Sequence, residues 1–343
     1  MRGLWRRGAW HNTLEDERDN MKKAAMWVCT VAMATGLTGG AQADDSWPSK
    51  PVRVIVPFPA GTSADVTGRA VAALLAQQLG QPFIVENRPG TSGTIGQAMV
   101  AKAEPDGHTI LIASSSWTVV PATIPHLSFD PLKDFTGITI LAQIPNVLVV
   151  SPTAKISSVA ELVALARSRP GKLNYATVGT GSAMHLNAAR FQISAGIDAV
   201  QIPYKGSPEV LTDLIGGQVD FCFCPTSNVL PMIKDGRLVP LAVGSSRRSS
   251  ALPDVPATEE AGFPNSAYNF WIGLAVPAKT PLSVVQRLHA ETVRALNRPE
   301  VKARWDALGQ EMQISTPEQF SARLRDEMAS NAALVRAANI KAN

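Results

Sequence analysis

The stretch VRVIVPFPAGTSAD, residues 52–65, decides the fold class of this chain. Its first five residues are β-branched apart from one arginine, which is typical of a buried strand. A loop of glycine, serine and threonine follows, and apolar residues then recur every four positions from Val66 to Leu74, which predicts a helix that ends before Gly80. A strand, a small-residue loop and a helix in this order form the first unit of a parallel α/β sheet.

The same alternation continues along most of the chain. Short apolar runs predict further strands, and helical patterns separate them. The expected strands cover residues 83–85, 109–113, 146–150, 173–178, 200–203, 219–223, 239–243 and 270–276. The segment after residue 276 is mainly helical, so it must pack on a lobe that already has a sheet.

These elements predict an α/β protein of two lobes. Its 343 residues exceed one ordinary domain of about 100–200 residues. We expect residues 44–148 together with 269–343 to form lobe one and residues 149–268 to form lobe two, joined by two hinge strands near residues 148 and 270. Two such connections permit hinge closure over a ligand.

The N-terminal residues indicate export. Met21-Lys22-Lys23 precedes an apolar run at 24–37, and small residues follow at 41–43. This is the pattern of a secretory signal peptide, and the run is shorter than the roughly 20 apolar residues that span a bilayer. We expect a leader and signal peptide over residues 1–43, a true start at Met21 because acidic residues precede it, and a periplasmic location.

Charge and cysteine content exclude several classes of protein. Removal of residues 1–43 leaves 26 basic and 24 acidic residues without a basic cluster, which argues against nucleic-acid binding. Only Cys222 and Cys224 remain after the signal. A disulfide between them would close a very small loop and require a bent backbone, so we expect free thiols on a strand. The pair lacks the further ligands of a metal site, and no metal or cofactor is expected.

Four loops that follow predicted strands are rich in glycine, serine and threonine. They cover residues 57–65, 114–116, 179–185 and 204–207. In parallel sheets, ligands bind beyond the carboxyl ends of the strands. Helix N-termini leave backbone amides without acceptors, and amides and hydroxyls together hold an anion. The loops therefore predict a site for a small carboxylate.

Several side chains near these loops have two open interpretations. Asp65 has capping-box spacing from the preceding threonine, so it either caps its own helix or contributes to the site. Gly61 could serve only a positive φ. His185 is either a satisfied surface histidine or a ligand contact, and Lys205 is either solvated or a carboxylate contact. We expect Asp220 to be buried with a hydrogen-bond partner and to orient a ligand-binding loop.

Motifs for catalysis are absent. The sequence contains no nucleophile elbow, no HExxH motif, no phosphate-binding P-loop and no dinucleotide-binding fingerprint. We therefore expect a binding protein rather than an enzyme. Two rivals stay open: a ligand-presenting periplasmic sensor, and a periplasmic α/β hydrolase whose triad is assembled from distant residues.

Segments in a fixed order over nearly the whole mature chain resemble a known family. They are WPSKPVRVIVPFPAGTSAD, VENRPGTSGTIG, AKAEPDGHTILIAS, PGKLNYATVGTGSAMH, VQIPYKG, LIGGQVD, RRSSALPDVPATEEAGFP, FWIGLAVPAKTP and NRPEVKARWDALGQE. This series resembles the Bug-type substrate-binding proteins of tripartite tricarboxylate transporters. The order makes the resemblance specific.

The resemblance implies a periplasmic binding protein of type II, the Venus-flytrap kind. It also implies that the ligand is a small organic acid: a dicarboxylate, a tricarboxylate or an aromatic carboxylate. It also implies delivery to membrane transporter subunits, and we expect a monomer. The contacts implied for lobe one are Phe58, Ala60, Gly61, Thr62, Ser63, Asp65, Ser115 and Ser116. Those implied for lobe two are Thr180, Gly181, Ser182, His185, Lys205 and Gly206.

The chain departs from the family pattern at three places. Thr62 stands where a second glycine is frequent, and Cys224-Pro225-Thr226 stands where a loop with Asp or Asn is frequent. Trp117 follows the serine loop where a smaller residue is commoner. An aromatic side chain at the rim of the pocket would favour a ring-bearing acid.

Overall fold

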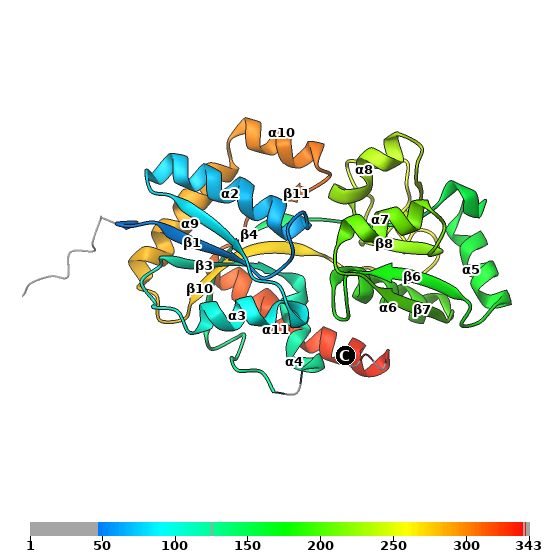
Figure 1. The fold of residues 1–343 in the computed structure, drawn as a ribbon, viewed down its shortest axis with the longest axis horizontal. Helices are drawn as coiled ribbons and strands as arrows, with labels where there is room; N and C mark the ends of the chain where they lie inside the picture. The colour runs from blue at the N-terminus through cyan, green and yellow to red at the C-terminus, as the bar shows by residue number, and fades with distance from the viewer. Residues whose placement is uncertain (1–46, 125, 339, 341–343) are drawn as a thin grey trace, which may run out of the picture. The chain divides into compact units, whose positions relative to one another are not determined.

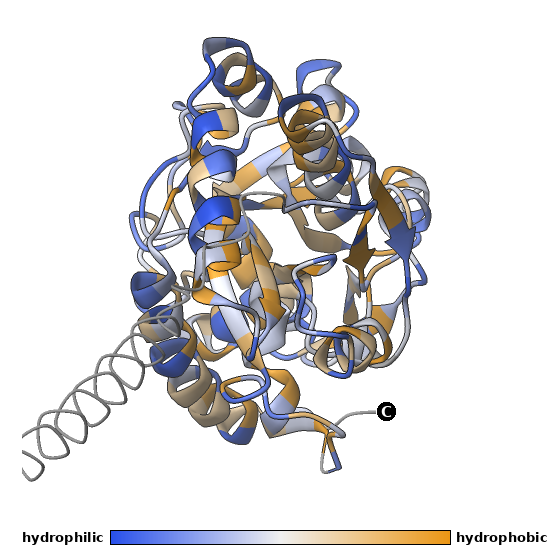
Figure 2. Ribbon diagram, turned by 90° about the vertical axis from the view of Figure 1, so that its left-hand side faces the viewer, coloured by the Kyte–Doolittle hydropathy of each residue, from blue (hydrophilic) through white to orange (hydrophobic). Residues whose placement is uncertain are grey.

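The computed structural model describes residues 47–124, 126–338 and 340 of the chain. The predicted signal peptide and start site lie outside the described residues. Within the described ranges, none of the helices has both the length and the apolar character of a membrane span. The described part contains two sheets, each covered by helices (Figure 1). Figure 2 shows hydrophobic residues concentrated in the strands.

The first sheet has the strand order β11-β4-β10-β3-β1-β2. Strands β2 and β3 pair parallel to β1, and β10 pairs antiparallel to both β3 and β4. Its strands are β1 (Val52–Val56), β2 (Phe83–Asn87), β3 (Thr109–Ser114), β4 (Phe135–Gln143), β10 (Trp271–Pro277) and β11 (Glu311–Met312). Its helices are α2 (Ser63–Leu79), α3 (Thr94–Ala101), α4 (Val120–Thr123), α9 (Leu282–Leu296), α10 (Pro299–Ala307) and α11 (Pro317–Ala337), with short 3-10 turns η1 (Thr91–Gly93) and η2 (Ser115–Thr118).

The second sheet has the order β7-β6-β8-β5-β9. Strands β7 and β8 run parallel to β6, whereas β5 pairs antiparallel with β8 and β9. Its strands are β5 (Asn146–Val150), β6 (Leu173–Thr177), β7 (Ala199–Pro203), β8 (Phe221–Pro225) and β9 (Val239–Val243). Its helices are α5 (Val159–Ser168), α6 (Ala183–Ala195), α7 (Ser207–Ile215) and α8 (Thr226–Lys234), with a 3-10 turn η3 (Pro152–Ala154).

The chain passes between the sheets twice. The first passage lies between β4 and β5 at residues 144–145, and the second lies between β9 and β10 at residues 244–270. Strand β5 therefore lies wholly in the second sheet and β10 wholly in the first. The exact boundaries of the two lobes, near residues 148 and 269, stay a prediction.

Strand β4 was missing from the predicted strands, although it pairs with β10 along its whole length in the first sheet. It carries Gly137, and Gly273 lies in the neighbouring strand β10. A Cβ on Gly137 would lie 2.5 Å from the ring of Phe320, and one on Gly273 would lie 2.9 Å from the same ring. The helical tail therefore packs on the first sheet by placing Phe320 over two glycines. Glycine weakens a strand signal, which is why the sequence pattern missed β4.

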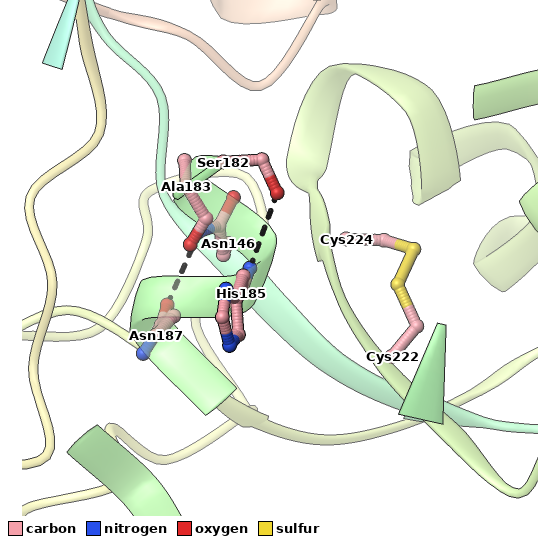
Figure 3. Close-up of a disulfide and its surroundings, with 7 residues drawn as sticks. All are labelled: Asn146, Ser182, Ala183, His185, Asn187, Cys222 and Cys224. Atoms are coloured by element: carbon pink, nitrogen blue, oxygen red, sulfur yellow. Dashed lines mark hydrogen bonds between the residues drawn. A yellow bond between two sulfur atoms is a disulfide. The ribbon is translucent and has the colours of Figure 1, made fainter. Parts of the chain in front are cut away.

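The expectation of free thiols is wrong, because Cys222 and Cys224 form a disulfide within β8 (Figure 3). Alternate residues of a strand project from the same face. The two Cα atoms are 5.4 Å apart, within the range that a disulfide bridges. Both residues are buried. The loop is short, but the shared face lets the bond form inside the strand.

Candidate ligand-binding cleft

A small cavity of about 60 Å³ lies between segments of the two sheets. The first-sheet part of the chain contributes the β1–α2 loop with the start of α2, the β3–η2 segment, and the residue before β10. The second-sheet part contributes the ends of β6 and β8 and the starts of α6 and α7. The lining residues are Phe58, Thr62, Ser63, Ala64, Ser114, Ser116, Val178, Ser182, Ala183, Met184, Ser207, Pro225 and Phe270.

A larger compartment of about 510 Å³ adjoins this cavity. We call the small cavity the inner compartment and the larger one the outer compartment. The two compartments share five lining residues, which form the neck between them: Phe58, Thr62, Ser116, Val178 and Ser182. The outer compartment adds prolines and glycines of the β1–α2 and β2–α3 loops, together with Thr180 and Lys205. All four of the loops predicted from the sequence line one compartment or both.

Three helices begin at the inner compartment. Residues Ser63 and Ala64 open α2, Ala183 and Met184 open α6, and Ser207 opens α7. The first amides of a helix have no acceptor within the helix, and the helix dipole makes this end positive. The positive ends of three helix dipoles and their unpaired amides therefore converge on the inner compartment, an arrangement that suits a carboxylate group.

The family follows from comparison of this chain with known proteins. A family model described as the tripartite tricarboxylate transporter family receptor matches residues 67–340. The chain belongs to this family. Protein BugT of Bordetella pertussis is 34% identical over 316 residues, which cover 92% of this receptor and 97% of BugT.

Solved structures confirm the two-lobed binding-protein fold. An R. palustris protein with adipate matches with a TM-score of 0.82 and 31% identity, over 86% of this receptor and 99% of that chain. MatC from Rhodopseudomonas palustris with bound malate matches with a TM-score of 0.78 and 30% identity, over 84% of the receptor and 100% of that chain. The resemblance inferred from the sequence segments is thereby confirmed.

The local fold of the β1–α2 loop resolves the two interpretations of Asp65. Thr62 caps α2 by accepting a hydrogen bond from the Asp65 amide. The Asp65 carboxylate is buried and accepts hydrogen bonds from the Gly61 amide (3.0 Å), Arg69 Nε (2.9 Å) and Asn87 Nδ2 (2.8 Å). Burial raises the pKa of Asp65, but these three hydrogen bonds outweigh it and lower that pKa below its usual value. In the receptor, the Asp65 carboxylate therefore holds the backbone of the β1–α2 loop in place and lines neither compartment.

Gly61 has the positive φ that its loop needs, at +78°. A Cβ at this position would meet no atom within 4 Å, and the residue does not line either compartment. Its contribution to the receptor is the turn that brings Thr62 and Ser63 to the cavity.

Seven of the predicted site residues line one of the two compartments of the receptor or both. They are Phe58, Thr62, Ser63, Ser116, Thr180, Ser182 and Lys205. The other eight predicted residues line neither compartment: Ala60, Gly61, Asp65, Ser115, Gly181, His185, Gly206 and Asp220. All of them except Asp220 lie in or behind the same loops.

Asp220 is the exception, and the expectation that it orients a ligand-binding loop is wrong. It precedes β8, and its carboxylate accepts a hydrogen bond from the backbone amide of Asn174 at 2.6 Å. Asn174 lies near the start of β6, and β8 runs parallel to β6. Asp220 therefore lies at the amino ends of these strands, whereas the cavity lies at their carboxyl ends.

Trp117 is not at the rim of the pocket, so the inference of a ring-bearing acid loses its basis. The η2 turn directs the indole into the core of the first sheet, where it is fully buried. Its ring meets the ring of Phe135 edge-on, with 4.9 Å between centroids. Ser116, one residue earlier, faces the cavity instead.

Four apolar residues that line the inner compartment were not among the predicted contacts. Val178, Met184, Pro225 and Phe270 line the inner compartment. Ser92, from the β2–α3 loop, lines the outer compartment, and its hydroxyl donates to the Thr180 carbonyl at 2.9 Å. The loop around Ser92 has the same glycine, serine and threonine composition as the four predicted loops and also follows a strand, and that signal could have identified it.

His185, in the first turn of α6, is buried, so its interpretation as a surface histidine is wrong. Its Nδ1 accepts a hydrogen bond from the Gly181 amide at 3.1 Å. Burial lowers the pKa of His185 from 6.5 to about 4. The neutral ring thus supports the loop at residues 179–182, which lines both compartments.

We expect acidification to destabilise the receptor through His185. Its folded pKa lies below its unfolded value, so the unfolded chain binds more protons between these values. The stabilisation is complete above pH 6.5 and is lost as the pH falls from 6.5 to about 4. The full loss is about 3 kcal/mol. Urea unfolding at several pH values should show a smaller loss for His185→Asn, whose amide oxygen can accept from Gly181 without titrating. An equal loss in both proteins would contradict this role.

Proposed function

We propose that this receptor captures a small organic carboxylate in the periplasm and delivers it to the membrane subunits of a tripartite tricarboxylate-type transporter, without chemical turnover. One observation carries the proposal. The first turns of three helices, α2, α6 and α7, meet at one cavity, and none of the described residues that line it has an acidic side chain. Such a site attracts an anion and does not repel it.

The residues proposed to contact the ligand come from both walls. In the inner compartment, the amides at the start of α2 and α6 and the hydroxyls of Ser116 and Ser182 would hold one carboxylate group, because the Thr62 hydroxyl already donates to the Pro59 carbonyl. The predicted contacts that do not line the cavity, such as Asp65 and His185, would act by supporting the loops. This division follows the hydrogen bonds and burial described above.

The lining also indicates which acids fit. Among the described residues that line the two compartments, Lys205 is the one with a charged side chain, and it lies in the outer compartment. A second carboxylate reaching into the outer compartment would therefore meet a cation, and the ligands of two related structures, adipate and malate, are both dicarboxylates. A buried ammonium group needs an acidic partner, which this lining does not provide.

We expect dicarboxylates to bind more tightly than amino acids of the same skeleton. Aspartate should bind at least tenfold more weakly than succinate, and 2-aminoadipate at least tenfold more weakly than adipate. Thermal shifts of the mature chain, followed by calorimetric titration, measure both ratios. Equal or tighter binding of the amino acids would contradict the proposed ligand class, and no stabilisation by any mono-, di-, tri- or aromatic carboxylate would contradict the function itself.

Capture would also require the two predicted lobes to close around the ligand, at the two passages between the sheets. Hydroxyl groups already join the walls in this structure: Ser63 Oγ lies 2.9 Å from Ser227 Oγ, and Ser92 donates to Thr180. A ligand that contacts both walls favours the form in which they are close. Solution scattering with a saturating acid should show a smaller radius of gyration than without it.

A further inference from the structure

A polar network lies behind the cavity and is centred on Arg190 of α6. The Arg190 Nη2 donates to Ser330 Oγ at 3.1 Å and to Asn331 Oδ1 at 3.3 Å, both on α11. The guanidinium also lies over the ring of Tyr268, 5.8 Å from its centroid. Arg190 therefore joins a second-sheet helix to a first-sheet helix and to the passage between the sheets.

Two of the three partners of Arg190, Asn331 and Tyr268, connect onward to the serine segment η2. Asn331 is buried, and its Nδ2 donates to Thr118 Oγ1 at 2.7 Å. The Tyr268 hydroxyl donates to Ser115 Oγ at 3.0 Å. Thr118 Oγ1 in turn donates to the Ser115 carbonyl at 2.7 Å. Two separate branches from one guanidinium thus hold the two ends of a four-residue turn.

The turn and the helix that this network connects are opposite walls of the ligand cavity. Ser116, between the two held residues, lines both compartments. Helix α6 begins with Ala183 and Met184 at the inner compartment, and Arg190 lies about two helical turns further along the same helix. A rigid helix transmits the position of Arg190 to its own first turn.

We propose that Arg190 is a positioning residue that sets the spacing between the first turn of α6 and the serine turn η2. It does not touch the ligand. The proposal rests on the proposed function in one respect: a carboxylate bound between these walls needs donors from both at a fixed separation. Without the guanidinium, Asn331 and Tyr268 lose their common anchor, and both walls become free to relax.

The test compares hydrogen exchange and ligand affinity in Arg190→Met with those in the unchanged chain. Methionine keeps much of the apolar stem but removes the donors and the charge. We expect faster amide exchange at residues 115–119 and at 183–186 in the ligand-free protein, and a Kd for the best-binding dicarboxylate that rises at least tenfold. The control is Arg248→Met, which removes an exposed ion pair with Glu260 and should change neither quantity.

A second variant separates positioning from general loss of stability. Tyr268→Phe removes only the bond to Ser115, so exchange should rise at residues 115–119 and stay unchanged at 183–186. Unchanged exchange at 115–119 in both variants would overturn the proposal. Exchange does not require a ligand, so this readout decides the network even if no carboxylate binds, which would instead overturn the proposed function. Normal affinity in a folded Arg190→Met protein would also overturn the positioning role.

Discussion

Replacement of Val178 with tryptophan should abolish ligand binding while the protein stays folded. Val178 is half-buried and forms part of the neck between the inner and outer compartments. An indole at this position fills the passage and separates the helix N-termini from the outer compartment. We expect the Kd for the preferred carboxylate to rise at least 100-fold, which corresponds to about 2.7 kcal/mol. Calorimetric titration measures this change directly.

The matched control is Val200→Trp. Val200 is also a strand-associated valine of the second-sheet part, but it is 44% exposed in β7 and lines neither compartment. Its replacement adds the same side chain without approaching the cavity, so affinity should stay within about twofold. Full affinity in a folded Val178→Trp protein would show that the ligand does not occupy this neck.

Replacement of Gly244 with alanine should destabilise the protein by about 3 kcal/mol, because it overpacks a buried polar cluster. A Cβ at Gly244 would overlap the side-chain amide of Asn187. Asn187 accepts from Asn146 Nδ2 at 3.2 Å and donates to the Ser266 carbonyl at 3.2 Å. Figure 3 shows Asn146, Asn187 and Ala183 together at the start of α6. The melting temperature should fall by roughly 5–10 °C in calorimetry.

The cluster also reaches the ligand cavity, since Asn146 Nδ2 donates to the Ala183 carbonyl at 3.3 Å. Displacement of Asn187 should therefore weaken ligand binding as well as stability. Gly206→Ala is the comparison, because its Cβ would meet only Pro208 Cδ at 3.6 Å. We expect that change to cost less than 1 kcal/mol. If Gly244→Ala melts at the temperature of the unchanged chain, the amide cluster is not rigid and the explanation fails.

Local patterns in the sequence were sufficient for most elements of the fold. Strand β1 and helix α2 were predicted from apolar periodicity, and Gly80 ends α2 in the left-handed conformation as expected. The four small-residue loops all reach the cavity, because the carboxyl ends of parallel strands meet at one edge of a sheet. The family was also recognisable from short segments in a fixed order.

Errors arose where a residue's role depends on a distant partner. Trp117 and Asp220 were assigned to the site by their neighbours in sequence, yet one packs on Phe135 and the other bonds to Asn174 at the opposite end of its strand. Strand β4 was missed because Gly137 weakens its strand pattern. The position needs a glycine because it packs against Phe320, which lies 183 residues later in the chain.

The sequence by itself determined the α/β class, the order of most elements, the family and the loops that carry amide and hydroxyl donors. These features depend on periodicity, capping and turn residues, which act over a few positions. Only the tertiary structure decided which side of each loop faces the cavity, that Cys222 and Cys224 are joined, and that Arg190 connects the two walls. Those outcomes depend on register and packing between segments far apart in the chain, and local patterns do not encode them.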